Sequence, residues 1–192
     1  MVAILKYNAG NIKSVENAVK KLGFDCLVTD NFDEIRKAEK VIIPGVGEAS
    51  SAMEYLKNHN LDILIKSLTQ PVLGICLGLQ LMCKFSEEGN VDCLGIFDTK
   101  VKKFPAKEIV PHMGWNNLQD CKSELYKDFF ENSDVYFVHS YYAEICENTI
   151  ATCDYILPFS ASLQKNNFYA TQFHPEKSAE VGIKILKNFL NL

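Results

Sequence analysis

The segment with the clearest chemical meaning is a cysteine between two glycines. Cys76 follows the apolar run 72–75 and has Gly74 and Gly78 two residues away on either side. A buried strand that turns sharply into a helix at such a residue forms a nucleophile elbow, where neighbouring backbone comes too close for a side chain at either glycine. The thiol would then lie at a helix N-terminus, whose partial positive charge favours the thiolate. A buried structural cysteine between two packing glycines is the alternative.

A base for this thiol is available near the other end of the chain. His174 is followed by Pro175 and Glu176. The Glu176 carboxylate can accept a hydrogen bond from the imidazole nitrogen that faces away from the thiol, which fixes the tautomer and stabilises the imidazolium ion. A histidine at a strand end often has no catalytic role. Combined with the cysteine elbow, however, it indicates a triad of Cys76, His174 and Glu176.

Acyl transfer also requires hydrogen-bond donors for the developing oxyanion, and the loop Pro44-Gly45-Val46-Gly47 follows a strand in a suitable place. The backbone N–H groups of Leu77 and of Val46 or Gly47 are the candidates. A plain strand-to-helix turn is the alternative. Neither the P-loop nor the dinucleotide glycine pattern occurs, so phosphate binding is less favoured.

The elements that must position these residues alternate between strand and helix in the first half of the chain. Asn11 is expected to cap the first helix and Gly23 to end it. The patterns predict strands at 2–7, 26–29, 40–43 and 72–75, and helices at 12–22, 33–39, 52–58, 61–67 and 77–85. This order requires a parallel sheet with right-handed crossovers.

After Gly89 the pattern changes to shorter strands, expected to be antiparallel, and ends in one amphipathic helix. The strands are predicted at 100–104, 135–138, 149–153, 160–164 and 168–173, and the helix at 179–190. The sequence therefore predicts a three-layer α/β fold with a central mixed, largely parallel sheet, in a single domain over residues 1–192.

Composition excludes several classes of function. The 192 residues hold 20 basic and 24 acidic side chains, a net charge of −4 without a basic block, so no nucleic-acid partner is expected. The apolar runs are too short for a membrane span and no export signal is visible, which indicates a cytoplasmic protein. Seven scattered cysteines without a Cys-x-x-Cys pair predict no disulfide and no metal site, and no cofactor is expected.

Residues 74–78 and 174–176, at their usual separation, resemble the class I glutamine amidotransferases, which have a flavodoxin-like fold, and the match runs the full length. Within that family the chain resembles the glutaminase subunits of imidazole glycerol phosphate synthases. This closer resemblance lies in segments 7–11, 44–47, 111–116, 139–142 and 172–178.

The resemblance implies a reaction and a binding site for glutamine. Cys76 attacks the side-chain amide, His174 protonates the departing ammonia, and water releases glutamate from the thioester. Residues that would hold the amino-acid head group of glutamine are Gln80, Glu88 and the Ser140–Tyr141 backbone, with Gly47 near the amide. Otherwise Gln80 and Glu88 are solvated helix positions and Tyr141 is an ordinary aromatic residue at a strand end.

The resemblance also implies a partner, a separate (β/α)-barrel cyclase subunit that forms a heterodimer with the chain. The cyclase would join the ammonia to a phosphoribulosyl-type aminoimidazole-carboxamide nucleotide, giving imidazole glycerol phosphate and the purine precursor AICAR in histidine biosynthesis. Residues expected to face it are Asn11, Met113, Trp115, Tyr136 and Lys177. Trp115 is expected in a non-periodic loop as an interface anchor, with a core tryptophan as the alternative.

A conformational hypothesis accompanies this partner. The Gly45-Val46-Gly47 peptide would rest with an N–H group turned away from the oxyanion site, and partner binding would favour the turned-in form. Three rival functions stay open. They are a glutaminase that serves another synthase such as one that amidates sugars, a non-catalytic flavodoxin-like module, and a cysteine peptidase or esterase.

Overall fold

The computed structural model describes residues 1–128 and 133–192. Its helices are α1 (Ile12–Lys21), α2 (Phe32–Lys37), α3 (Ala49–Asn58), α4 (Leu61–Ser67), α5 (Leu77–Met82) and α6 (Ala179–Leu190), with short 3-10 helices η1 (Glu124–Tyr126) and η2 (Pro175–Lys177). The strands of the first half are β1 (Val2–Leu5), β2 (Cys26–Thr29), β3 (Lys40–Ile43), β4 (Val72–Ile75), β5 (Phe85–Ser86) and β6 (Val91–Asp92). Those of the second half are β7 (Lys100–Lys103), β8 (His112–Asn117), β9 (Asp134–His139), β10 (Tyr141–Ala143), β11 (Thr149–Tyr155), β12 (Leu157–Lys165) and β13 (Phe168–Thr171).

Within residues 1–128 and 133–192, eleven strands form one mixed sheet in the order β2-β1-β3-β4-β13-β12-β10-β7-β5-β6, with β11 paired to β12. The neighbours from β2 to β13 are all parallel, whereas β12 pairs antiparallel with β13, β10 and β11. Strands β8 and β9 form a separate two-stranded antiparallel ribbon.

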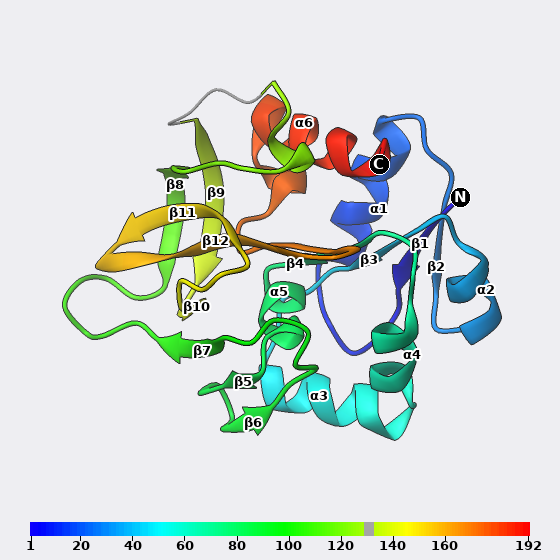
Figure 1. The fold of residues 1–192 in the computed structure, drawn as a ribbon, viewed down its shortest axis with the longest axis horizontal. Coiled ribbons are helices and arrows are strands. Elements are labelled where there is room, and N and C mark those ends of the chain that lie inside the picture. Colours follow the sequence, from blue (N-terminus) through cyan, green and yellow to red (C-terminus); the bar gives the residue numbers. More distant parts are fainter. Residues whose placement is uncertain (129–132) are drawn as a thin grey trace.

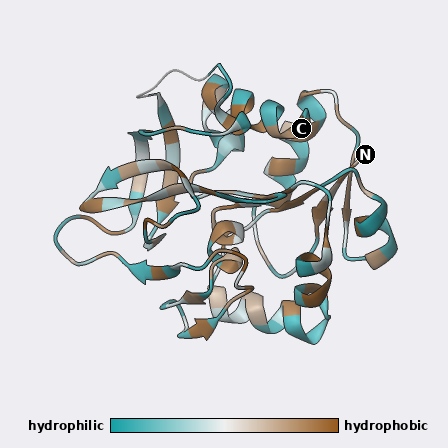
Figure 2. Cartoon of the chain, viewed as in Figure 1, coloured by the Kyte–Doolittle hydropathy of each residue, from teal (hydrophilic) through white to brown (hydrophobic). Residues whose placement is uncertain are grey.

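The apolar core lies in two layers, one on each face of the main sheet. Helices α3, α4 and α5 cover one face, and α1 and α6 cover the other (Figure 1). The strands between them carry mostly hydrophobic residues (Figure 2). In α6, Ile185, Leu186 and Phe189 are fully buried against this core, as the helical spacing predicts. The predicted layers and mixed sheet are confirmed.

Several predicted elements differ from the structure. Segment 168–173 pairs antiparallel with β12, as predicted, but as β13 it also pairs parallel with β4. The helix predicted over 77–85 ends at Met82, since the Lys84 N–H bonds to the Thr99 carbonyl and Phe85–Ser86 joins the sheet beside β7. Segment 113–116 is not a loop but part of β8, which pairs with β9. The local sequence around Gly114 does not reveal this pairing.

Two helix starts also differ from expectation. Asn11 has φ 67° and its side chain makes no capping hydrogen bond to α1. Helix α3 begins at Ala49 rather than residue 52, because the Glu48 carboxylate accepts hydrogen bonds from the Ser50 and Ser51 N–H groups and so caps it. No helix within residues 1–128 and 133–192 has the length and apolar character that crossing a bilayer requires.

Candidate active site

The turn from β4 into α5 places Cys76 in a strained backbone conformation, with φ 53° and ψ −104°. Both flanking glycines are required by close backbone contacts. A Cβ at Gly74 would lie 2.7 Å from the Gly78 carbonyl carbon, and a Cβ at Gly78 would lie 2.2 Å from the Ile43 carbonyl oxygen. The sharp turn predicted for the elbow is therefore present, and the thiol lies at the start of α5.

Parallel pairing brings the predicted base to this thiol. Strand β13 lies beside β4 with Thr171 opposite Ile75, so the residues that follow each strand emerge at the same edge of the sheet. The Cys76 N–H donates to the Thr171 carbonyl at 2.7 Å. His174, three residues further along, is anchored by its own N–H to the Tyr136 carbonyl at 3.0 Å. The sheet thus brings together residues that are nearly 100 positions apart in sequence.

His174 and Glu176 form a buried pair. His174 Nδ1 lies 2.7 Å from Glu176 Oε1, and neither side chain is exposed to solvent. Burial lowers the pKa of His174, but the adjacent Cys76 and Glu176 raise it more, so that it reaches about 10. Within the described residues His174 Nε2 has no hydrogen-bond partner. This nitrogen is therefore available for the thiol proton.

Asn11 contributes to the same pair instead of capping α1. Its amide donates to Glu176 Oε1, and Nδ2 lies 3.4 Å from His174 Nδ1. The left-handed backbone at Asn11 turns this side chain toward the triad. The sequence predicts Asn11 at a partner interface, and the structure gives it a contact with the predicted orienting carboxylate.

The loop 44–47 is clamped by three hydrogen bonds to its carbonyl groups. Tyr7 Oη donates to the Pro44 oxygen, the Leu77 N–H donates to the Gly45 oxygen at 3.2 Å, and the Gly10 N–H donates to the Val46 oxygen at 2.9 Å. The Leu77 N–H, one predicted oxyanion donor, is thus engaged by the loop. In this conformation the loop presents a carbonyl group, not an N–H group, to that donor.

A cavity of about 270 Å³ opens beside the thiol. Its lining includes predicted site residues from four segments: Val46, Gly47, Cys76, Leu77, Gln80, Glu88, Ser140 and Tyr141. Glu88 Oε2 accepts the Ala49 N–H at 2.9 Å, and burial raises the pKa of this carboxyl group. The interpretation of Gln80 and Glu88 as plain solvated positions is wrong, since Gln80 is 4% exposed and both line the cavity.

The polar groups of this cavity are already partly used. Gln80 Nε2 donates to the Tyr141 carbonyl and to Gln172 Oε1, each at 3.1 Å. The Ser140 carbonyl accepts the Phe104 N–H at 3.0 Å. Both backbone carbonyls of the pair 140–141 therefore already accept hydrogen bonds within the fold.

Comparison with known proteins agrees with this geometry. The family model for Glutamine amidotransferase class-I matches residues 3–192. The chain belongs to the class I glutamine amidotransferases. Among solved structures similar to it are a glutamine amidotransferase, with a TM-score of 0.76 at 17% identity over 99% of this chain and 97% of that one, and a glutamine amidotransferase from Thermotoga maritima, with 0.64 at 17% over 99% and 80%. These likenesses confirm the predicted fold class.

Curated relatives of this amidotransferase are more similar in sequence. Imidazole glycerol phosphate synthase subunit HisH of Bacteroides fragilis is 62% identical, with 100% of this chain and 99% of the relative aligned. The proteins of the same name from Bacteroides thetaiotaomicron and Pasteurella multocida are 57% and 46% identical, with 99% and 96% of their lengths aligned.

The β8–β9 ribbon of the amidotransferase carries three of the five residues expected at a partner interface, Met113, Trp115 and Tyr136. Met113 and Trp115 are 63% and 54% exposed, so the alternative of a core tryptophan is wrong. Trp115 packs edge-on against Tyr136 across the ribbon, with ring centroids 6.0 Å apart. Lys177, on η2 beside the triad, is also exposed. Strand pairing holds the indole in one place on the surface.

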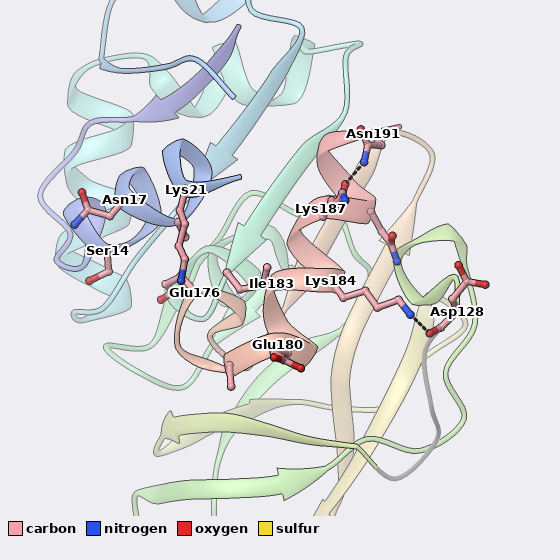
Figure 3. A pocket seen from close by; sticks show the side chains of 13 residues that line it. Ser14, Asn17, Lys21, Asp128, Glu176, Glu180, Ile183, Lys184, Lys187 and Asn191 are labelled. Atoms are coloured by element: carbon pink, nitrogen blue, oxygen red, sulfur yellow. Dashed lines mark hydrogen bonds between the residues drawn. The ribbon is translucent and has the colours of Figure 1, made fainter. Parts of the chain in front are cut away.

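A larger groove of about 870 Å³ lies between α1 and α6 (Figure 3), and Cys76 is not among the residues that line it. Of the triad, only Glu176 reaches its wall, together with the polar residues Lys21, Glu180 and Lys184. Figure 3 shows Lys21 on α1, Glu180 and Lys184 on α6, and Glu176 on the segment that precedes α6. The chemistry of the thiol therefore belongs to the smaller cavity.

Sequence reasoning assigns no role to three buried polar residues near this site: His112, His139 and Gln172. All three lie in segments that carry the family resemblance. His139 gives a local signal, because it is the polar last residue of the largely apolar strand β9, whereas the neighbours of His112 and Gln172 give none. Among the described residues no group of three or more His, Cys, Asp or Glu side chains could hold a metal ion.

Proposed function

We propose that this chain hydrolyses glutamine and passes the ammonia to a separate cyclase subunit of an imidazole glycerol phosphate synthase. The observation that carries the proposal is the pairing of the Cys76 elbow with the fully buried His174–Glu176 pair, whose Nε2 is without a partner among the described residues. The full-length identity of 62% to a protein named as a subunit of that synthase supports the choice of pathway.

The reaction starts with transfer of the Cys76 proton to His174 Nε2. The thiolate attacks the amide carbon of glutamine, and the imidazolium ion returns the proton to the departing ammonia. Water then attacks the thioester with His174 as base, releasing glutamate and the free thiol. Glu176 holds the imidazole through Nδ1 and stabilises its charged form throughout, which is consistent with the raised pKa of His174.

Glutamine would bind in the 270 Å³ cavity through complementary charges. The Glu88 carboxylate and Gln80 Oε1 accept hydrogen bonds from the ammonium group, because both amide protons of Gln80 are already used. The N–H groups of Ser140 and Tyr141 bind the carboxylate, and Gly47 lies near the side-chain amide.

The oxyanion site requires a change in the loop. While the Gly45 carbonyl accepts the Leu77 N–H, that donor is not free for a tetrahedral intermediate. Rotation of the Gly45–Val46 peptide would release it and present the Val46 N–H to the oxyanion. We propose that docking of the cyclase favours this rotation, which would keep ammonia from being made without its acceptor.

The partner would be a (β/α)-barrel that forms a heterodimer over the site, with contacts to Asn11, Met113, Trp115, Tyr136 and Lys177. The complex would act in the cytoplasm, where free cysteines such as the seven of this chain remain reduced. No cofactor enters the proposed reaction.

The test combines the chain with the cyclase subunit of the Bacteroides fragilis synthase and its nucleotide substrate, and follows glutamate release. We expect glutamate only when both subunits and Cys76 are present. Cys76→Ser and His174→Ala should abolish glutamate release, while added ammonium salt still supports the cyclase reaction. Stimulation only by another synthase, such as one that amidates a sugar, would refute the choice of partner. Absence of a thioester with a glutamine-like electrophile at Cys76 would refute glutaminase chemistry.

A further inference from the structure

Gln172 is a fully buried amide that the proposed mechanism does not use. It follows β13 and lies two residues before His174. Its Nε2 is 3.6 Å from Cys76 Sγ, and its Oε1 accepts a hydrogen bond from Gln80 Nε2 at 3.1 Å. A polar group that is this deeply buried is costly unless both ends are paired. Here one of the pairing atoms is the reacting sulfur.

The orientation of this amide follows from its neighbours. The Tyr141 carbonyl can only accept, so the atom of Gln80 that lies 3.1 Å from it must be the amide nitrogen. The second N–H of that nitrogen points at Gln172, which must therefore present its oxygen to Gln80. The Gln172 nitrogen then has to face the sulfur. The opposite orientation would place two NH₂ groups together and a carbonyl oxygen against a thiolate.

The Tyr141 carbonyl, from which these orientations follow, is itself held by a second hydrogen bond. It accepts His139 Nδ1 at 2.8 Å, while His139 Nε2 lies 3.0 Å from His112 Nδ1. Asn116 Nδ2 lies 3.3 Å from His112 Nε2. Because burial lowers the pKa of His112 to about 4 and that of His139 to about 3, both rings are neutral near pH 7 and each Nδ1 carries the proton. The donor and the acceptor of each hydrogen bond in this series are then fixed, with the Tyr141 carbonyl accepting from both His139 and Gln80.

We propose that Gln172 is a catalytic residue, whose amide N–H donates to the Cys76 sulfur, stabilises the thiolate and keeps it directed at the substrate. This inference rests on the proposed glutaminase function. When Cys76 gives its proton to His174, the negative charge on sulfur has the imidazolium ion on one side and the Gln172 N–H on the other. The S–C bond formed in the attack consumes this charge, and thioester hydrolysis restores it. Gln80, which touches the amide but not the sulfur, is a positioning residue.

The pH dependence of Cys76 alkylation tests this role. Five titratable groups face the sulfur or its cavity, namely His174, Tyr7, His139, Tyr141 and Glu88. Burial raises the pKa of the Tyr141 hydroxyl. Burial raises the pKa of Tyr7 far above its usual range, and His139 stays neutral above about pH 3. Between pH 6 and 9 the reactivity therefore reports on the coupled Cys76–His174 pair.

The experiment measures the rate of iodoacetamide labelling at Cys76 in the whole chain, resolved from the other cysteines by peptide mass spectrometry. Gln172→Met keeps the length of the side chain and removes the donor. Loss of a hydrogen bond to a charged group should move the midpoint of the pH–rate curve up by about one pH unit. Below the midpoint this lowers the thiolate fraction about 10-fold. Because a more basic thiolate is also more nucleophilic, the variant should react more slowly below the midpoint and faster above it.

Crossing of the two curves separates this role from a structural one. Damage to the site would lower the rate at every pH, and that result, or an unmoved midpoint, would overturn the inference. Gln164→Met, on β12, is the matched control and should follow the wild-type curve.

If Gln172→Met does not fold, Gln80→Met carries the test, since it frees the Gln172 amide to turn and should give the same crossing. Labelling needs no cyclase. If the two pH–rate curves cross but the complex releases no glutamate, the proposed function is refuted and the role of Gln172 is not.

Discussion

Replacing Cys76 by glycine should stabilise the chain relative to its alanine variant. The backbone at Cys76 has φ 53° and ψ −104°, a conformation that glycine adopts readily and other residues do not. Strain of this kind costs about 1–3 kcal/mol. Glycine lacks one buried carbon that alanine has, a loss of about 0.8 kcal/mol. Glycine also loses about 0.5–1 kcal/mol more backbone entropy on folding than alanine does. Taking the middle of each range, Cys76→Gly should exceed Cys76→Ala in unfolding free energy by about 0.5 kcal/mol.

Thermal and urea unfolding of the two variants measure this difference directly. Comparing glycine with alanine removes the contribution of the sulfur, because both variants lack it. For a chain of this size about 0.5 kcal/mol corresponds to a Tm that is higher by about 1–2 °C. The matched control is Ala52→Gly, inside α3 and 1% exposed, which should lower stability by about 1 kcal/mol or more.

The sign of the effect decides the matter. An alanine-to-glycine change normally destabilises a protein, so only backbone strain at residue 76 can reverse it. If Cys76→Gly falls below Cys76→Ala by as much as the Ala52 control falls below wild type, the elbow is not strained. The assumption that the surrounding contacts hold the nucleophile in an unfavourable conformation would then be wrong.

Four further predictions concern packing, pH and the partner. Gly78→Ala should cost about 1–3 kcal/mol in urea unfolding, because its Cβ would lie 2.2 Å from the Ile43 oxygen; unchanged stability would contradict the close contact. With the partner present, Glu88→Gln should raise KM for glutamine. The wild-type KM should rise as pH falls through the raised pKa of Glu88, and a flat profile would remove it from the site. Wild-type stability should decline as pH falls from about 6.5 towards 4, because the unfolded chain binds protons that buried His112 and His139 do not. His112→Asn should make that decline in Tm shallower, and an equal slope would argue against its neutral state. Trp115→Ala should weaken cyclase binding in calorimetry by about 2 kcal/mol, whereas an undiminished affinity would exclude the ribbon from the interface.

Local sequence is sufficient for the elbow and for the carboxylate beside the base. Gly74 and Gly78 signal the elbow by their spacing around Cys76, although the close contact of Gly78 is with Ile43 of β3. His174 and Glu176 are two positions apart, so their relation hardly depends on the rest of the fold. The same holds for α6, whose apolar spacing alone places Ile185 and Phe189 in the core.

Other features depend on partners distant in the chain. Local sequence predicts a loop where β8 lies, because the hydrogen-bond partner of this strand, β9, begins 17 residues after β8 ends. Asn11 satisfies the local rule for a helix cap, yet its amide bonds to Glu176, which is 165 positions away. Gln172 has no distinguishing local pattern, and only the Tyr141–Gln80 contacts orient its amide toward the sulfur.

Short stretches of sequence thus specify the nucleophile, its base and the alternating α/β order, because these follow from backbone sterics and side-chain periodicity. The folded structure was needed to show that β13 lies beside β4, and hence that Cys76 and His174 meet at one edge of the sheet. It was also needed to show which way the Gly45 carbonyl and the Gln172 amide point. Strand order and hydrogen-bond direction are set by atoms that approach only when the chain is folded, so no local pattern records them.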